Sequence, residues 1–201
     1  FVSLNYRVGV LGFMAHPELS EESGHNASGN YGFLDQMAAL EWVQKNISAF
    51  GGDPENVTIA GQSAGAFSVN TLIASPLARG LFHKAVLQSG GLLSNRLNQN
   101  LESAEKAGTH FMEVAGQPSL ADLRKMSAEE LQAISNDTSV GRFGVTLDGY
   151  VLPENLLEHF AKGGHQQIPV MAGWVTGDGS FLGPLDMSVA DYRSEAETLF
   201  G

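Results

Sequence analysis

Cysteine is absent from the sequence, which excludes disulfide bonds and cysteine-ligated metal sites within these 201 residues. Basic residues are scarce, with 11 Lys and Arg against 22 Asp and Glu and a formal net charge of −11. This balance argues against nucleic acid or an anionic membrane as a partner, because both attract basic surfaces. No apolar run approaches the length of a membrane span, and neither a phosphate-binding glycine loop nor metal-ligand spacing occurs. We therefore expect a soluble protein without cofactor or metal, and either the cytoplasm or export fits this composition.

The residues that are present are typical of a packed globular domain. Hydrophobic residues make up 43% and charged residues 16% of the sequence, and the length suits one domain or a large part of one. The chain opens within Phe1–Leu4, which has the apolar pattern of a buried strand, rather than on an initiator Met or a charged leader. We therefore expect these residues to be an internal piece of a longer protein.

Strand-like and helix-like segments alternate along most of the chain. A polar surface loop is expected over His16–Gly29, and helices are expected over Asn30–Phe50 and Ser63–Ala74. The expected strands, the last of them buried, are Phe1–Asn5, Val57–Ala60, Lys84–Gln88 and Gln167–Gly173. Alternation of this kind predicts an α/β fold with a mostly parallel sheet and helices on both faces.

Residues 98–140 interrupt this alternation. Three short amphipathic helices are expected there, at Glu102–Ala115, Ser119–Lys125 and Ser127–Ile134, with N-caps at Ser103, Ser119 and Ser127. Since no strand separates them, we predict a helical insertion over one end of the sheet, within a single partial domain spanning residues 1–201. Insertions in this position often form the roof of a pocket.

The feature most informative about chemistry is the pentapeptide GQSAG, Gly61–Gly65, which directly follows an apolar β-branched segment. This layout predicts a nucleophile elbow, a strained strand-to-helix turn that exposes the oxygen of Ser63 at the top of a sheet. Gly61 and Gly65 have no side chain, so neighbouring backbone can approach the strained residue. The N–H of Ala64 would then lie at a helix start, directed at a developing oxyanion.

A pentapeptide of this kind also arises by chance, because the chain holds 24 glycines. The segment Leu87–Gly91, LQSGG, is a similar string without the same setting. The strand expected before Ser63 and the helix expected after it favour the elbow.

A serine nucleophile needs a base to take its proton and an acid to orient that base, in the chain order Ser, acid, His for α/β-hydrolases. Asp178 lies in the turn after the last expected strand, where that acid belongs, although an ordinary Asp-Gly turn explains it equally well. Asp148 is a rival, but it precedes the strand and fits a structural turn better. No histidine follows Asp178, so Ser63 has no evident base in this chain; the six histidines are His16, His25, His83, His110, His159 and His165.

The stretch Phe50–Gly65, FGGDPENVTIAGQSAG, resembles the serine active-site signature of the type-B carboxylesterases, the carboxylesterase/cholinesterase family. The resemblance continues in order over nearly the whole chain, through Asn5–Arg7 with Gly9, Gly12 and Phe13, Gly29–Gly32 with Asp35 and Gln36, Leu81–Gly90, Asp148-Gly149 with Leu152-Pro153, and Ile168–Val170 with Gly173. It implies an α/β-hydrolase fold and a serine hydrolase that acts on small-molecule esters through an acyl-enzyme.

Carried over residue by residue, the resemblance makes Ser63 the nucleophile and the Ala64 N–H part of the oxyanion hole. Asp178 falls where the family usually has Glu, a departure of one methylene that the acid role tolerates. Ser89 matches a serine near the acid, so a supporting hydrogen bond is expected there. Gln62 is expected to be a second supporting residue beside the nucleophile. It stands where cholinesterases carry Glu, which argues against a cationic choline ester as substrate.

The same resemblance assigns two parts of the site to segments outside the chain. The glycine-rich oxyanion loop belongs upstream of Phe1, and the catalytic His belongs beyond Gly201. We therefore expect the N- and C-terminal parts of the fold to be missing and the chain to be inactive by itself. Two alternatives stay open, a non-catalytic adhesion or scaffold relative and an acyltransferase or thioesterase on the same fold. The sequence indicates neither the particular ester nor the oligomeric state.

Overall fold

The computed structural model describes residues 1–90, 99–137, 139–178 and 187–200. The chain consists of two compact units, residues 1–39 with 98–154 and residues 40–97 with 155–201. The first contains α1 (Gly9–Phe13), α2 (Pro17–Glu22), β3 (Gln99–Asn100), α5 (Leu101–Val114), α6 (Leu120–Leu123), α7 (Ala128–Ser135) and β4 (Thr146–Leu147). The second contains η1 (Ile47–Phe50), η2 (Pro54–Asn56), β1 (Thr58–Gln62), α4 (Ala64–Ala74), η3 (Pro76–Ala78), β2 (Lys84–Gln88), α8 (Leu156–Ala161), β5 (Val170–Gly173) and α9 (Val189–Phe200). Helix α3 (Tyr31–Asn46) begins in the first unit and ends in the second.

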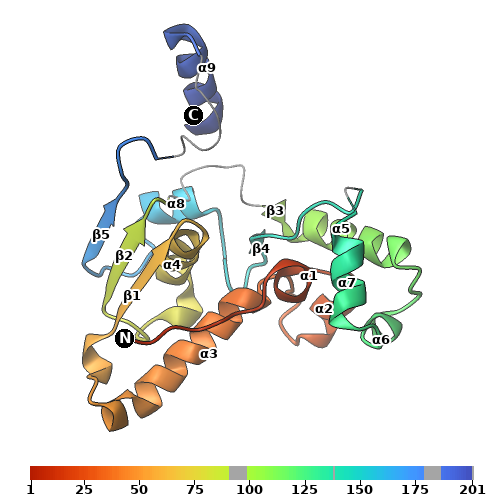
Figure 1. Cartoon of the computed structure of the whole chain (residues 1–201), viewed down its shortest axis with the longest axis horizontal. Coiled ribbons are helices and arrows are strands. Elements are labelled where there is room, and N and C mark those ends of the chain that lie inside the picture. Colours follow the sequence, from red (N-terminus) through yellow and green to blue (C-terminus); the bar gives the residue numbers. More distant parts are fainter. Residues whose placement is uncertain (91–98, 138, 179–186, 201) are drawn as a thin grey trace. The chain divides into compact units, whose positions relative to one another are not determined.

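The second unit is built on a parallel sheet with the strand order β1-β2-β5. Its register pairs Gln62 with Gln88 and Gln88 with Gly173, so the three strands end at the same edge. Helix α4 packs against β1 and β2 (Figure 1). Its buried residues include Val69 and Leu72. The expected parallel α/β arrangement is confirmed, and β2 has the predicted bounds.

The first unit has a core supplied mainly by its helices. Buried apolar residues there are Met14, Leu19, Phe111, Met112, Leu120, Leu123, Leu131 and Val140. The predicted N-caps Ser119 and Ser127 are confirmed, and Ser127 forms a full capping box with Glu130. The predicted cap at Ser103 is wrong, because α5 begins earlier and Asn100 accepts a hydrogen bond from the Ser103 N–H.

Three expectations for single segments are also wrong. Phe1–Asn5 is not a strand, because a strand needs a pairing partner and the described residues supply none for it. The polar stretch His16–Gly29 is not all loop, since Pro17 and the Nδ1 of His16 start α2. Strand β5 was expected to be buried, but all four residues are exposed, since it is an edge strand and α4 packs on β1 and β2 instead.

Arg7 and Asp35 join the N-terminal segment to α3 within the first unit. The guanidinium donates from Nε to Oδ2 at 2.9 Å and from Nη2 to Oδ1 at 2.7 Å, and the Arg7 N–H also donates to Oδ2 at 2.9 Å. The hydrogen bonds from Arg7 hold the pKa of the Asp35 carboxyl below its ordinary value of 3.8. The paired form therefore stabilises the fold above that value, and the contribution is lost as pH falls through the lowered pKa.

Replacing Arg7 by Ala is expected to lower the free energy of unfolding by about 1 kcal/mol at neutral pH, since the pair is bidentate but half-exposed. Urea denaturation at a series of pH values measures this difference, which should shrink as pH falls below 3.8. Arg7→Lys is the matched control, because it retains the charge and loses the bidentate geometry. A difference that stays constant down to pH 2 would show that the ion pair is not its cause.

Candidate active site

Ser63 lies between the last residue of β1 and the first residue of α4, as the elbow requires. Its backbone has φ 51° and ψ −116°, a conformation that residues with a side chain rarely adopt. Strain of this kind costs about 1–3 kcal/mol and persists only where the surroundings enforce it. Here the Ser63 N–H donates to the Gln88 carbonyl at 2.9 Å, which ties the turn to β2. The side chain is exposed at the carboxyl edge of the sheet.

The two glycines of the pentapeptide differ in what they permit. A Cβ at Gly61 would overlap the carbonyl group of Gly65 and lie 2.8 Å from the Ala66 nitrogen, so only glycine lets α4 start this close to β1. A Cβ at Gly65 would meet no atom of the described residues within 4 Å. The backbone approach expected at both glycines therefore leaves no room for a side chain at Gly61, whereas Gly65 has room for one.

Ala64 is the first residue of α4 and directly follows the strained serine. The first four N–H groups of an α-helix have no partner within the helix, and they carry the positive end of its dipole. The Ala64 N–H has this position and lies one residue from the Ser63 oxygen in the chain. A developing negative charge on a substrate bound to Ser63 would be stabilised by such a donor.

Asp178 lies in a turn five residues beyond β5, in which its N–H donates to the Val175 carbonyl at 3.1 Å and Gly177 has φ 77°. The carboxylate is exposed. Strands β1 and β5 lie on either side of β2, so Ser63 and Asp178 both follow the carboxyl ends of strands in one three-stranded sheet. In open α/β sheets this edge is where ligands bind.

Ser89 directly follows β2, between the strands that lead to Ser63 and Asp178. It has φ 52°, and its N–H donates to the Gly173 carbonyl at 2.8 Å. The part of the LQSGG string that the structure describes, Leu87–Gly90, lies beside the elbow, since the Gln88 carbonyl accepts the Ser63 N–H. Gln62 is the last residue of β1 and is exposed beside Ser63. The supporting roles expected of Ser89 and Gln62 stay predictions.

The second unit contains three histidines, His83, His159 and His165, of which His159 is buried in α8. His83 precedes β2 and so lies at the amino edge of the sheet, opposite Ser63, where its Nδ1 accepts the Val57 N–H at 3.1 Å. His165 precedes β5 and stacks on Phe160, with ring centroids 4.4 Å apart. His83 and His165 thus lie before strands, at the edge of the sheet opposite Ser63.

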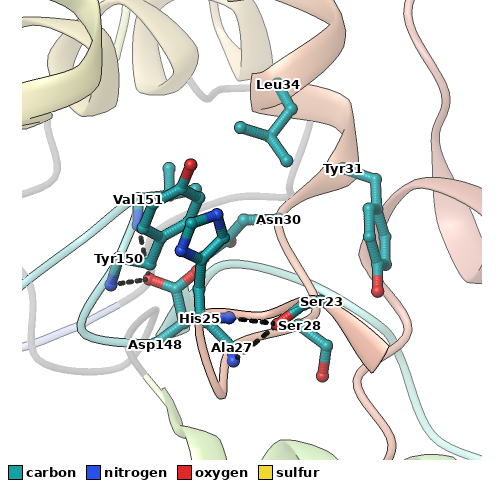
Figure 2. Close-up of a pocket in the computed structure, with 10 residues that line it drawn as sticks. All are labelled: Ser23, His25, Ala27, Ser28, Asn30, Tyr31, Leu34, Asp148, Tyr150 and Val151. Atoms are coloured by element: carbon teal, nitrogen blue, oxygen red, sulfur yellow. Dashed lines mark hydrogen bonds between the residues drawn. The ribbon is translucent and has the colours of Figure 1, made fainter. Parts of the chain in front are cut away.

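Asp148, the rival acid, belongs to the first unit and has a structural role there. Its Oδ1 accepts the N–H groups of Tyr150, Val151 and Leu152 at 3.1, 2.9 and 2.9 Å, which fixes the turn that follows. Figure 2 shows this turn beside His25, whose ring stacks on Tyr150 with centroids 3.9 Å apart. Asp148, His25 and Tyr150 are among the residues that line a cavity of about 220 Å³, to which none of Ser63, Ala64 and Asp178 contributes.

No helix within the described ranges combines the length and the apolar character needed to cross a membrane. The predicted insertion at residues 98–140 belongs to the first unit, together with residues 1–39. Its placement over an end of the sheet stays a prediction.

Comparison with known proteins identifies the family that this site fits. A sequence model described as "Carboxylesterase family" matches residues 1–200. The chain is 41% identical over 210 residues to a fumonisin B1 esterase from Sphingopyxis macrogoltabida, and 38% identical over 188 residues to a para-nitrobenzyl esterase from Bacillus subtilis. Among solved structures, the carboxylesterase EST55 of Geobacillus stearothermophilus matches with a TM-score of 0.78 at 34% identity.

These matches cover almost all of this chain and a minor part of each relative. They include 100% and 89% of this chain for the two esterases and 96% for EST55. They include 38%, 37% and 43% of the respective relatives. The chain thus spans less than half the length of each of these three relatives.

Proposed function

The chain belongs to the carboxylesterase family and contains part of the α/β-hydrolase fold, and from this premise we propose that the full-length protein hydrolyses small-molecule carboxylic esters through an acyl-enzyme on Ser63. The observation that carries the proposal is the strained serine at φ 51°, seated between β1 and α4. Strained backbone of this kind occurs preferentially at active sites, where it forms part of the mechanism.

Each residue has a distinct part in the proposed reaction. The Ser63 oxygen attacks the ester carbonyl while a histidine outside these 201 residues takes its proton. The Ala64 N–H stabilises the oxyanion of the tetrahedral intermediate, which then expels the alcohol after the histidine protonates it. Asp178 orients the histidine and stabilises its charged form. In the deacylation half of the reaction, the histidine takes a proton from water, which attacks the acyl-enzyme carbonyl. The carboxylic acid leaves and the Ser63 hydroxyl is restored.

A fluorophosphonate probe tests the proposal directly, since it reacts covalently with an activated serine. The full-length wild type should be labelled at Ser63, and Ser63→Ala should not be labelled. Ser48→Ala, which removes an exposed serine from η1, is the matched control and should react like the wild type. An unlabelled wild type would favour a non-catalytic scaffold, whereas labelling of Ser63→Ala would exclude Ser63 as the nucleophile.

Asp178→Asn in the full-length protein should lower kcat by about 10⁴-fold, because the amide holds the histidine in the wrong tautomer. Asp178→Glu should retain most of the activity, since Glu is the usual carboxylate at this position in the family that the sequence resembles. Asp148→Asn is the comparison for the rival acid and should leave kcat unchanged, because an amide oxygen still accepts the three N–H groups. Steady-state kinetics with a p-nitrophenyl ester decide between the two carboxylates: loss of kcat in Asp148→Asn alone would reverse the assignment.

A further inference from the structure

The backbone that leaves β2 crosses the first turn of α4 at very short range. A Cβ at Gly90 would overlap the Ala66 Cβ and lie 2.8 Å from the Ser63 carbonyl oxygen. Contacts this close require one of the two segments to move. Gly90 therefore has no room for any side chain, and the atoms that exclude it belong to the elbow itself.

Two further contacts hold the crossing in place. Asn70, one turn beyond Ala66 on α4, donates from Nδ2 to the Ala66 carbonyl at 3.3 Å and to the Gly90 carbonyl at 3.5 Å. Ser89 turns through φ 52° and donates its N–H to Gly173 at 2.8 Å. The end of β2 is thus tied to β5 on one side and to α4 on the other.

From these contacts we infer that Gly90 is a positioning residue for catalysis, which seats the Ser63 carbonyl and the first turn of α4 so that the serine oxygen and the Ala64 N–H keep their mutual geometry. Asn70 supports it as a tether between the crossing and the helix. The inference rests on the proposed function, since it assigns Gly90 a role in that same reaction. Neither residue touches the substrate in this account.

The effect should appear in kcat rather than in KM. A methyl group at Gly90 displaces the N-terminal turn of α4, which carries the nucleophile and an oxyanion donor, while substrate contacts elsewhere are unaffected. Misplacement of reacting groups by about 1 Å can cost about 100-fold, so we expect Gly90→Ala to lower kcat by about tenfold or more with KM nearly unchanged. Rates are expressed per active site titrated with the fluorophosphonate probe, because a purely structural defect lowers the number of sites and leaves kcat per site intact.

A compensating substitution tests the steric cause. The nearest atom to the added methyl group is the Ala66 Cβ, so Ala66→Gly removes it. In the Gly90→Ala background, Ala66→Gly should recover kcat per site by about threefold or more, and Ala66→Gly alone completes the double-mutant cycle. Gly144→Ala is the control for replacing a glycine by alanine without a steric clash, because a Cβ at Gly144 would meet no described atom within 4 Å. Its kcat per site should equal that of the wild type.

Asn70→Asp keeps the test decisive if Gly90→Ala does not fold. It retains the shape of the side chain, removes the donor to both carbonyls, and should lower kcat per site by about threefold with KM unchanged. The inference would be overturned if Gly90→Ala had the wild-type kcat per site. If Gly90→Ala does not fold, a wild-type kcat per site in Asn70→Asp would overturn it instead. So would a Gly90→Ala defect that Ala66→Gly does not relieve. A wild type without titratable sites would instead overturn the proposed function, and the inference with it.

Discussion

Full-length protein with Ser63→Ala is expected to lose about 10⁶-fold in kcat for ester hydrolysis, the size of loss seen when the nucleophile is removed from other serine hydrolases. The loss is this large because no neighbouring group takes over the covalent step. Ser89, the next serine at the same sheet edge, follows a different strand, and its N–H is bound to Gly173. Residual hydrolysis over the uncatalysed rate should come from oxyanion donors and binding alone.

The measurement is the initial rate with a p-nitrophenyl ester, at protein concentrations that allow a 10⁶-fold range to be followed. Thermal unfolding of the variant controls for folding, and Ser63→Ala is expected to retain wild-type stability, because the side chain is exposed and makes no capping hydrogen bond to α4. Ser48→Ala should keep the wild-type rate. A Ser63→Ala protein with more than about 1% of wild-type activity would mean that the covalent step proceeds elsewhere or not at all.

The elbow could be predicted closely because its determinants are local. The β-branched run before Gly61, the glycines and the apolar residues of α4 are all within about 20 residues, and each sets its own backbone preference. The structure begins α4 at Ala64, one residue after the predicted start, and ends it at the predicted Ala74. Gly61 was expected to permit a close backbone approach, and the overlap of its Cβ with Gly65 confirms it.

The misplaced features depend on contacts between residues far apart in sequence. Phe1–Asn5 and Val170–Gly173 have the composition of buried strands, but burial depends on which elements pack against them, and composition does not report this. The role of Gly90 is likewise hidden, since the atoms that exclude a side chain there lie 24 and 27 positions earlier, at Ala66 and Ser63. The sequence offers only one signal that Gly90 passes close to α4, which is the Ser89-Gly90 pair directly after β2.

The 201 residues expressed alone are expected to hydrolyse a p-nitrophenyl ester no faster than the same residues with Ser63→Ala. The chain order of the triad is Ser, acid, His, and no histidine follows Asp178, so we propose that the base lies outside these residues. The carboxyl-edge site then lacks the group that makes Ser63 nucleophilic. Any oxyanion donor that the full-length protein supplies from outside these residues would add about 2.7–4 kcal/mol to the barrier when absent.

Circular dichroism in the near and far ultraviolet establishes whether the 201-residue chain is folded, and the full-length protein at equal concentration provides the reference rate. Fluorophosphonate labelling supplies a second readout, which should be slow and should differ little between wild type and Ser63→Ala, because the probe also needs an activated serine. Hydrolysis that depends on Ser63 in the folded chain would require a base among the residues described here. His83 and His165 are poor candidates, since both precede strands and so lie at the amino edge of the sheet whose carboxyl edge holds Ser63. His159 is a poor candidate because it is buried in α8. Serine-dependent turnover would therefore overturn the assignment of the base, and it would leave the nucleophile itself in place.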